Sequence, residues 1–210
     1  MRIACGVHPR FAFNISDGQV STLRSLLESE GVVALGEIGL DNTSKNNASV
    51  VQQEGVLAKV LPLAVDSGLP VVIHCRGSEY LSSRCLEILK SCLPSTHLVH
   101  RHCFSGTLQE AEAWLVDFPN TVFGLTPTCL REGNEHMSEV IKQLPLTKLI
   151  LESDAPYLIP PHMSTFIKVG SPRLIPEVVR FVSKCRNLPM SLVAKVTART
   201  ACQFYSLVEQ

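Results

Sequence analysis

The sequence has no excess of charge of either sign. Lysine plus arginine and aspartate plus glutamate number 19 each among 210 residues, so the formal net charge is zero. A module that coats DNA or RNA normally carries a basic excess, so any contact with a polyanion must come from a local site such as a metal cluster. Long apolar runs are also lacking, which excludes a membrane span and a signal peptide. We therefore expect a soluble intracellular protein, cytoplasmic or nuclear, with no membrane association.

The eight cysteines include no C-x-x-C pair, which excludes a zinc ribbon and a thioredoxin-like motif. Five of them fall inside or beside apolar runs, where a free cysteine behaves as a small hydrophobe: Cys5, Cys75, Cys85, Cys103 and Cys129. We therefore expect reduced thiols. The sequence also lacks internal repeats and low-complexity segments, and its length suits one large domain or two small ones.

Short apolar runs rich in β-branched residues alternate with longer amphipathic segments. The runs predict strands buried on both faces, as in parallel sheets, at 3–7, 32–39, 69–75, 97–104, 121–126 and 148–154. The amphipathic segments predict helices at 17–29, 50–67, 79–92, 108–117, 135–143, 173–186 and 190–206, with Pro62 interrupting the second. This order indicates an α/β fold with parallel strands, although six strands are two short of a (β/α)8 barrel.

Potential metal ligands collect at the predicted carboxyl ends of four strands, where parallel α/β folds place their functional groups. These residues are Glu37, His74, the pair His100 and His102, and Asp154. Residues i and i+2 of a strand face the same way, so the two paired histidines are expected on one side. Imidazole and carboxylate suit a divalent metal, and a carboxylate can bridge two ions. Taken singly, each residue could instead be a hydrogen-bonded core group, a helix cap or a turn former.

Four motifs occur in an order and spacing that resemble the TatD family of metal-dependent deoxyribonucleases: GEIGLD (36–41), VVIHCR (71–76), HRHCFSG (100–106) and ESDAPYL (152–158). GVHP at 6–9 and LPL at 144–146 also fit, so the resemblance runs from residue 3 to about residue 206. It looks closest to the animal branch of the family. The resemblance implies a TIM (β/α)8 barrel of the metal-dependent hydrolase type, here a single domain over residues 1–210.

The resemblance also implies roles for individual side chains. Glu37 matches the bridging carboxylate, and His74 and His102 match two ligands of the second metal. Asp154 matches the carboxylate that completes the first metal site and helps to activate water. His100 is expected to lie deeper in the barrel, behind the ligands or in the core.

Two further residues are candidates for contact with a substrate phosphate. Arg76 follows His74 by two positions, and His8 stands in the GVHP motif. The alternative for His8 is that it shapes the turn before Pro9.

The sequence departs from the family pattern at its start. No strand carrying an H-x-H motif precedes IACGVHP, so we expect an N-terminally incomplete barrel that lacks the first two β/α units and two ligands of the first metal. GSP at 170–172 stands where the family has Asn-x-Pro. We therefore expect this chain alone to have little activity.

The expected function is that of a metal-dependent phosphodiester hydrolase, a deoxyribonuclease of the 3′ exonuclease type that uses a metal-activated water. DNA is the expected substrate, with RNA left open, and Mg²⁺, Mn²⁺ or Zn²⁺ the expected cofactors, two in the complete family site. No obligate protein partner is inferred. The alternatives are a catalytically impaired fragment, a partner-binding pseudo-enzyme, and a hydrolase of amide or other ester bonds on the same barrel.

Overall fold

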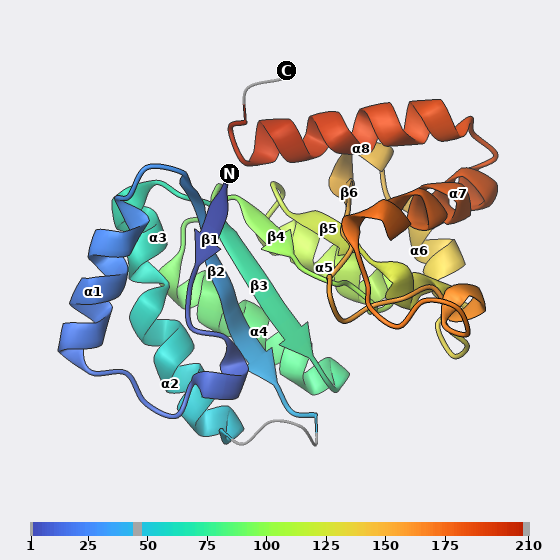
Figure 1. Ribbon diagram of the computed structural model, residues 1–210. Coiled ribbons are helices and arrows are strands. Elements are labelled where there is room, and N and C mark those ends of the chain that lie inside the picture. The colour runs from blue at the N-terminus through green and yellow to red at the C-terminus, as the bar shows by residue number, and fades with distance from the viewer. Residues whose placement is uncertain (1, 44–47, 208–210) are drawn as a thin grey trace. The chain divides into compact units, whose positions relative to one another are not determined.

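The computed structural model describes residues 2–43 and 48–207 (Figure 1). The chain divides into two compact units. The first comprises the chain up to Arg101 together with Ala113–Thr121, and the second comprises His102–Glu112 and the chain from Val122 onward. Within the described ranges, no helix is long and apolar enough to cross a membrane.

The first unit is built on four parallel strands. They are β1 (Ile3–Cys5), β2 (Val32–Asp41), β3 (Val71–Arg76) and β4 (Val99–Arg101), each paired in parallel with the next. The connecting helical segments are η1 (Pro9–Phe11), α1 (Asp17–Leu27), α2 (Val50–Val60), α3 (Pro62–Ser67) and α4 (Glu79–Cys92). Figure 1 shows α1, α2 and α3 lining one side of these strands. Strands β2, β3 and β4 are mostly buried, as their apolar sequences predicted, whereas Ile3 and Ala4 of β1 are exposed, so the expected burial on both faces is wrong for that strand.

Local sequence signals set where these helices begin and end. Ser16 forms a capping box with Gln19, and Ser49 forms the same arrangement with Gln52, so both helices start directly after a serine. Pro62 begins a new helix, so the single helix expected over 50–67 is divided as its proline predicted. The buried residues of α2 and α3 belong to the core beneath β2.

Two glycines of β2, Gly36 and Gly39, stand where a side chain would collide with β3. A Cβ on Gly39, whose φ is +143°, would stand 1.9 Å from the carbonyl oxygen of His74. The register also shifts between Leu35 and Ile38, where β2 carries one residue more than β3. Such a bulge re-aims the side chains next to it, and Glu37 lies within it.

The second unit contains two parallel strands, β5 (Val122–Leu125) and β6 (Leu149–Leu151). Its helical segments are η2 (Pro127–Leu130), α6 (Met137–Gln143), η3 (Leu146–Lys148), η4 (Pro161–Met163), η5 (Pro172–Leu174), α7 (Ile175–Arg186) and α8 (Met190–Phe204). Helix α5 (Leu108–Asp117) takes residues from both units. Asn187 ends α7 in the left-handed conformation, with φ of 52°.

The six strands and the helices expected from the sequence are confirmed, so the fold is α/β with parallel strands. The predicted end of one strand is wrong, and the error affects a candidate site residue. The run 97–104 forms a strand only over Val99–Arg101, and His102 lies in the turn that follows. Cys103 has φ of 46°, which no strand accommodates, so alternation within one strand does not orient His102. The eight-unit barrel and the single domain stay predictions.

The cysteines agree with the expected reduced state. All eight are free, and Cys85, Cys103 and Cys129 are buried. Cys85 and Cys129 pack as small side chains in the core, whereas the sulfur of Cys103 lies 3.2 Å from the hydroxyl of Thr126.

Candidate metal centres

Three side chains of the first unit place possible ligand atoms within 4.8 Å of one another: His8, Glu37 and His74. His8 follows β1, Glu37 stands in the bulge of β2, and His74 lies on β3. Oε2 of Glu37 is 3.4 Å from Nδ1 of His74 and 3.7 Å from Nε2 of His8. Glu37 and His74 thus lie on neighbouring strands, although β2 continues to Asp41, so Glu37 stands within its strand and not at the end that the sequence predicted.

A carboxylate behind His74 fixes its orientation. Nε2 of His74 lies 2.9 Å from Oδ2 of Asp41, so that nitrogen donates and Nδ1 faces Glu37. The other oxygen of Asp41 accepts hydrogen bonds from the backbone N–H and the hydroxyl of Thr43, at 2.8 and 2.6 Å. This carboxylate–imidazole pairing is the arrangement that orients metal-bound histidines.

The pKa values at this cluster follow from its charges. Burial opposes protonation of His74, but hydrogen bonds to Asp41 and Glu37 outweigh it and raise its pKa. Burial would raise the pKa of Asp41, but hydrogen bonds from His74 and Thr43 hold that pKa well below its ordinary value. Asp41 is therefore a carboxylate at neutral pH, as an acceptor for the imidazole must be.

His8 has a different hydrogen-bond pattern. Its Nδ1 accepts from the backbone N–H of Arg10 at 3.0 Å, so a neutral His8 carries its proton on Nε2. Burial, followed by the nearby charge of His74, lowers the pKa of His8 and favours this neutral form. The Nε2–H of His8 thus points as a donor toward Glu37, which suits a hydrogen bond to an anion better than metal ligation.

A buried glutamine fixes the backbone of Asp41. Gln53 of α2 is fully buried, and its carbonyl oxygen accepts from the Asp41 N–H at 2.7 Å. Its amide donates to the carbonyl oxygens of Asp41 and Ala48, at 2.9 and 2.8 Å. Helix α2 therefore positions the carboxylate that in turn positions His74.

The second unit holds another cluster, in which ligand atoms of His102, Cys103 and Asp154 lie within 4.8 Å of one another. Nε2 of His102 is 3.8 Å from Oδ1 of Asp154. Its Nδ1 is 2.9 Å from Oε1 of Glu152, and Oε2 of Glu152 accepts from the backbone N–H of Cys103 at 2.9 Å. Glu152 thereby holds the imidazole with Nε2 toward Asp154, as Asp41 does for His74 in the first unit.

Two residues of this second cluster have a strained backbone. Cys103 and Asp154 have φ of 46° and 47°, in the left-handed region that disfavours residues with a side chain. The other such non-glycine residues in the described chain, Asn187 and Ser206, follow the ends of helices. Strained residues away from helix ends are typical of functional sites, where the surrounding structure compensates the cost.

Sequence reasoning found the principal histidines and carboxylates but missed their partners. Asp41 and Glu152 stand inside the quoted motifs GEIGLD and ESDAPYL without having been given a role, and Cys103 was read as a core residue. A signal was present for Glu152, because acidic residues two positions apart at the end of a strand often serve one site. Arg76 is exposed at the end of β3, and His100 is buried on β4 opposite Val72.

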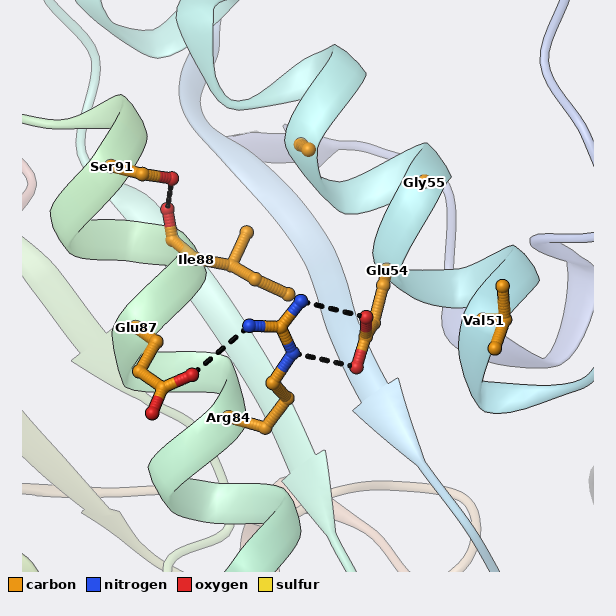
Figure 2. Close-up of a pocket in the computed structure, with 8 residues that line it drawn as sticks. Val51, Glu54, Gly55, Arg84, Glu87, Ile88 and Ser91 are labelled. Carbon is orange, nitrogen blue, oxygen red and sulfur yellow. Dashed lines mark hydrogen bonds and ion pairs between the residues drawn. The ribbon is translucent and has the colours of Figure 1, made fainter.

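A separate pocket lies between α2 and α4 (Figure 2). Arg84 crosses it, held by both oxygens of Glu54 at 3.0 Å and by Glu87 at 3.0 Å. Carboxylates thus compensate the charge of the arginine, and the lining contains no histidine or cysteine. Its carboxylates are engaged by Arg84, whereas the two carboxylate–imidazole clusters bring possible metal ligands together, so these clusters are the candidate sites.

The sequence of this chain matches the family model described as TatD related DNase over residues 1–206. The chain belongs to the TatD-related DNase family. Members of this family are nucleases, which are hydrolases that act on ester bonds. They are metal-dependent enzymes with a barrel fold. The resemblance noted in the four motifs is therefore confirmed.

Relatives within the TatD family are similar along nearly the whole chain. The human 3′-5′ RNA nuclease TATDN2 is 34% identical over 205 residues, which are 97% of this chain and 26% of that protein. The 3′-5′ ssDNA/RNA exonuclease TatD of Erwinia tasmaniensis is 34% identical over 205 residues, 96% of this chain and 77% of that protein. The chain thus spans about a quarter of the human relative and about three quarters of the bacterial one.

Solved TatD structures share the fold. The TatD homologue YJJV of Escherichia coli K12 superposes with a TM-score of 0.84 at 28% identity, covering 99% of this chain and 77% of that chain. A TatD-family hydrolase of Entamoeba histolytica gives 0.82 at 22% identity, covering 99% and 75%. The second likeness shows the fold alone.

Proposed function

We propose that this chain carries the catalytic machinery of a metal-dependent phosphodiesterase that removes nucleotides from the 3′ end of DNA, with RNA as a second substrate. The main support is the repeated arrangement of the two clusters. In each, one imidazole nitrogen is hydrogen-bonded to a carboxylate, and the other faces a second carboxylate. The human relative is named as a 3′-5′ nuclease of RNA and the bacterial one as a 3′-5′ exonuclease of single-stranded DNA and RNA, which supports the 3′ polarity.

The donor set fits a divalent ion. The nitrogen and oxygen atoms lie 3.4 Å apart at His74 and Glu37, the length of a long hydrogen bond, and 3.8 Å apart at His102 and Asp154, beyond hydrogen-bond length. Two ligand atoms that each lie about 2.1 Å from a tetrahedral Zn²⁺ are themselves about 3.4 Å apart. Imidazole and carboxylate accept Mg²⁺, Mn²⁺ and Zn²⁺, so Glu37, His74, His102 and Asp154 are the proposed ligands.

A bound ion would polarise the scissile phosphate and lower the pKa of a coordinated water. The residues of the chain do the remaining work. Asp154 accepts the proton of the attacking water, and Glu152 keeps the imidazole of His102 in the required tautomer. Asp41 does the same for His74.

Two side chains are proposed to receive the phosphate. The Nε2–H of His8, left as a donor by the hydrogen bond to Nδ1, would donate to a phosphoryl oxygen. Arg76, exposed at the end of β3, would add a positive charge. His100 is buried and is proposed to support the strand end rather than to contact substrate.

We also propose that the chain corresponds to the last six β/α units of an eight-unit barrel. Its coverage of 77% of the Erwinia relative supports this assignment. Full activity then requires two ligands from a further segment.

The test compares this chain with a version extended at its start by the corresponding segment of a TatD relative. Each is incubated with 5′-labelled single-stranded DNA or RNA and Mg²⁺, Mn²⁺ or Zn²⁺. We expect stepwise shortening from the 3′ end, stronger in the extended version, abolished by chelator and by Asp154→Asn. A 3′-blocked oligonucleotide is the control and should persist. Absence of metal-dependent nucleotide release in both versions, with hydrolysis of amide or small ester substrates instead, would contradict the proposal.

A further inference from the structure

The segment between β6 and α7 displays large apolar side chains to solvent. We call residues 155–174, which follow Asp154 directly, the 155–174 loop. Phe166 is 87% exposed, Tyr157 79% and Val169 62%. Aromatic rings this exposed contribute little to the core and are accessible to a ligand.

Hydrogen bonds hold the backbone of this loop in place, whereas its aromatic rings are exposed. The N–H of Gly170 donates to the carbonyl oxygen of Pro156 at 2.9 Å, which closes the loop near its two ends. A Cβ at Gly170 would lie 2.4 Å from the carbonyl oxygen of Leu158, so a glycine is required for this approach. Leu158 itself is buried and anchors the loop.

Hydrogen bonds also order the backbone beneath both aromatic residues. The N–H groups of Phe166 and Ile167 donate to the carbonyl oxygen of Met163, at 3.0 and 2.9 Å. The N–H of Tyr157 donates to the backbone carbonyl oxygen of Asp154 at 2.9 Å. Asp154 is also the residue that carries the proposed catalytic carboxylate. The exposed rings are therefore presented by an ordered backbone, which reduces the entropy lost when a ligand stacks on them.

The charge of the loop has one sign, in a chain whose net charge is zero. Residues 155–176 contain no aspartate or glutamate, but include Lys168 and Arg173. The next acidic residue, Glu177, forms ion pairs with Arg180 and with His162. The loop thus offers cations and aromatic faces without a carboxylate that would repel phosphate.

We propose that the 155–174 loop is a stacking platform for single-stranded nucleic acid. Bases stack on Phe166 and Tyr157, while Lys168 and Arg173 lie along the phosphates. Every base has a π face, so such contacts bind strands with little sequence preference. This inference rests on the proposed function and extends it to the binding of the strand behind its 3′ end.

The test measures binding of fluorescein-labelled dT and U oligonucleotides by anisotropy and, in the extended version, KM and kcat for their hydrolysis. Phe166→Ala should weaken binding about tenfold, within the range known for single stacked bases, and raise KM with little change in kcat. Phe166→Trp should retain wild-type affinity, whereas Phe166→Leu, apolar but without a π face, should resemble the alanine variant. Val116→Ala, at a position 79% exposed on α5, is the matched control and should have no effect.

Three results would contradict the proposal that the 155–174 loop is a stacking platform. Unchanged affinity and KM in Phe166→Ala would do so while leaving the nuclease function intact. Equal binding by the leucine and tryptophan variants would mean an ordinary apolar contact. Loss of self-association or of phospholipid-vesicle binding in Phe166→Ala, with oligonucleotide binding unchanged, would identify a second copy or a membrane as the occupant. If the wild-type protein neither binds nor cleaves any oligonucleotide, the nuclease function fails first and the platform with it.

Discussion

Oε1 of Glu152 lies 2.9 Å from Nδ1 of His102, although the two residues are 50 positions apart in the chain. The second oxygen of Glu152 holds the backbone N–H of Cys103, also at 2.9 Å. One carboxylate therefore fixes both the imidazole and the strained turn that carries it. A partner of this kind controls how well a histidine binds metal without touching the metal itself.

Replacing Glu152 should weaken metal binding while leaving the fold intact. Glu152→Gln keeps the size of the side chain but offers one carbonyl oxygen in place of two acceptors, so one of the two hydrogen bonds is lost. We expect affinity for Zn²⁺ or Mn²⁺ to fall about 10- to 100-fold in calorimetric titration. Glu132→Gln, on an exposed loop of the same unit, is the control and should bind normally. Equal affinity in both variants would show that Glu152 does not orient a ligand.

The two buried histidines of the first unit should differ in what they contribute. His74→Ala removes a proposed ligand, so the bound metal measured by elemental analysis should drop sharply. His100→Ala should retain most of the metal and instead lower the free energy of unfolding by about 1–3 kcal/mol, because it leaves a gap in the core. Equal loss of metal from the two variants would mean that the wrong histidine was chosen.

Gln53 should matter far more for stability than its neighbour Gln52. Gln53→Leu leaves three buried backbone groups of Asp41 and Ala48 without their partner and should cost about 2–4 kcal/mol in urea denaturation. Gln52→Leu removes only the exposed hydrogen bonds that its side chain accepts from Ser49 at the start of α2 and should cost about 1 kcal/mol or less. Similar losses in the two variants would argue against Gln53 as the support of Asp41.

Cys129 should resist alkylation and make stability fall at high pH. Burial, followed by the charge of Cys185, raises the pKa of the Cys129 thiol from 9.0 to about 12. Between these values the unfolded thiol loses its proton and the folded one keeps it, so the free energy of unfolding decreases as pH rises, by at most about 1.4 kcal/mol per pH unit.

Two measurements check this behaviour of Cys129. Iodoacetamide at pH 8 should modify Cys129 in urea-unfolded protein but not in native protein, as read by peptide mass spectrometry. Cys129→Ala should show a shallower decline of stability between pH 9 and 11 than the wild-type chain. Rapid alkylation of the native thiol would show that it is accessible and not buried.

Much of the architecture followed from local sequence patterns. Apolar runs such as VVIHC and VFGL predicted their strands, and Pro62 predicted the interruption of the helix expected over 50–67, because both effects depend on neighbours within a few residues. The proximity of Glu37 and His74 was also predicted from sequence, since their strands are paired neighbours, but the bulge that holds Glu37 in the middle of β2 was not.

The tertiary structure alone decided which partners hold these ligands. Asp41 and Glu152 act across 33 and 50 residues of chain, and no local pattern states which carboxylate will meet which imidazole nitrogen. The sequence likewise placed His102 in a strand because its neighbours are apolar, whereas the positive φ of Cys103 ends that strand and turns His102 toward Asp154. Composition and periodicity thus determined the elements, and long-range hydrogen bonds determined the tautomers and the strained turns on which the chemistry depends.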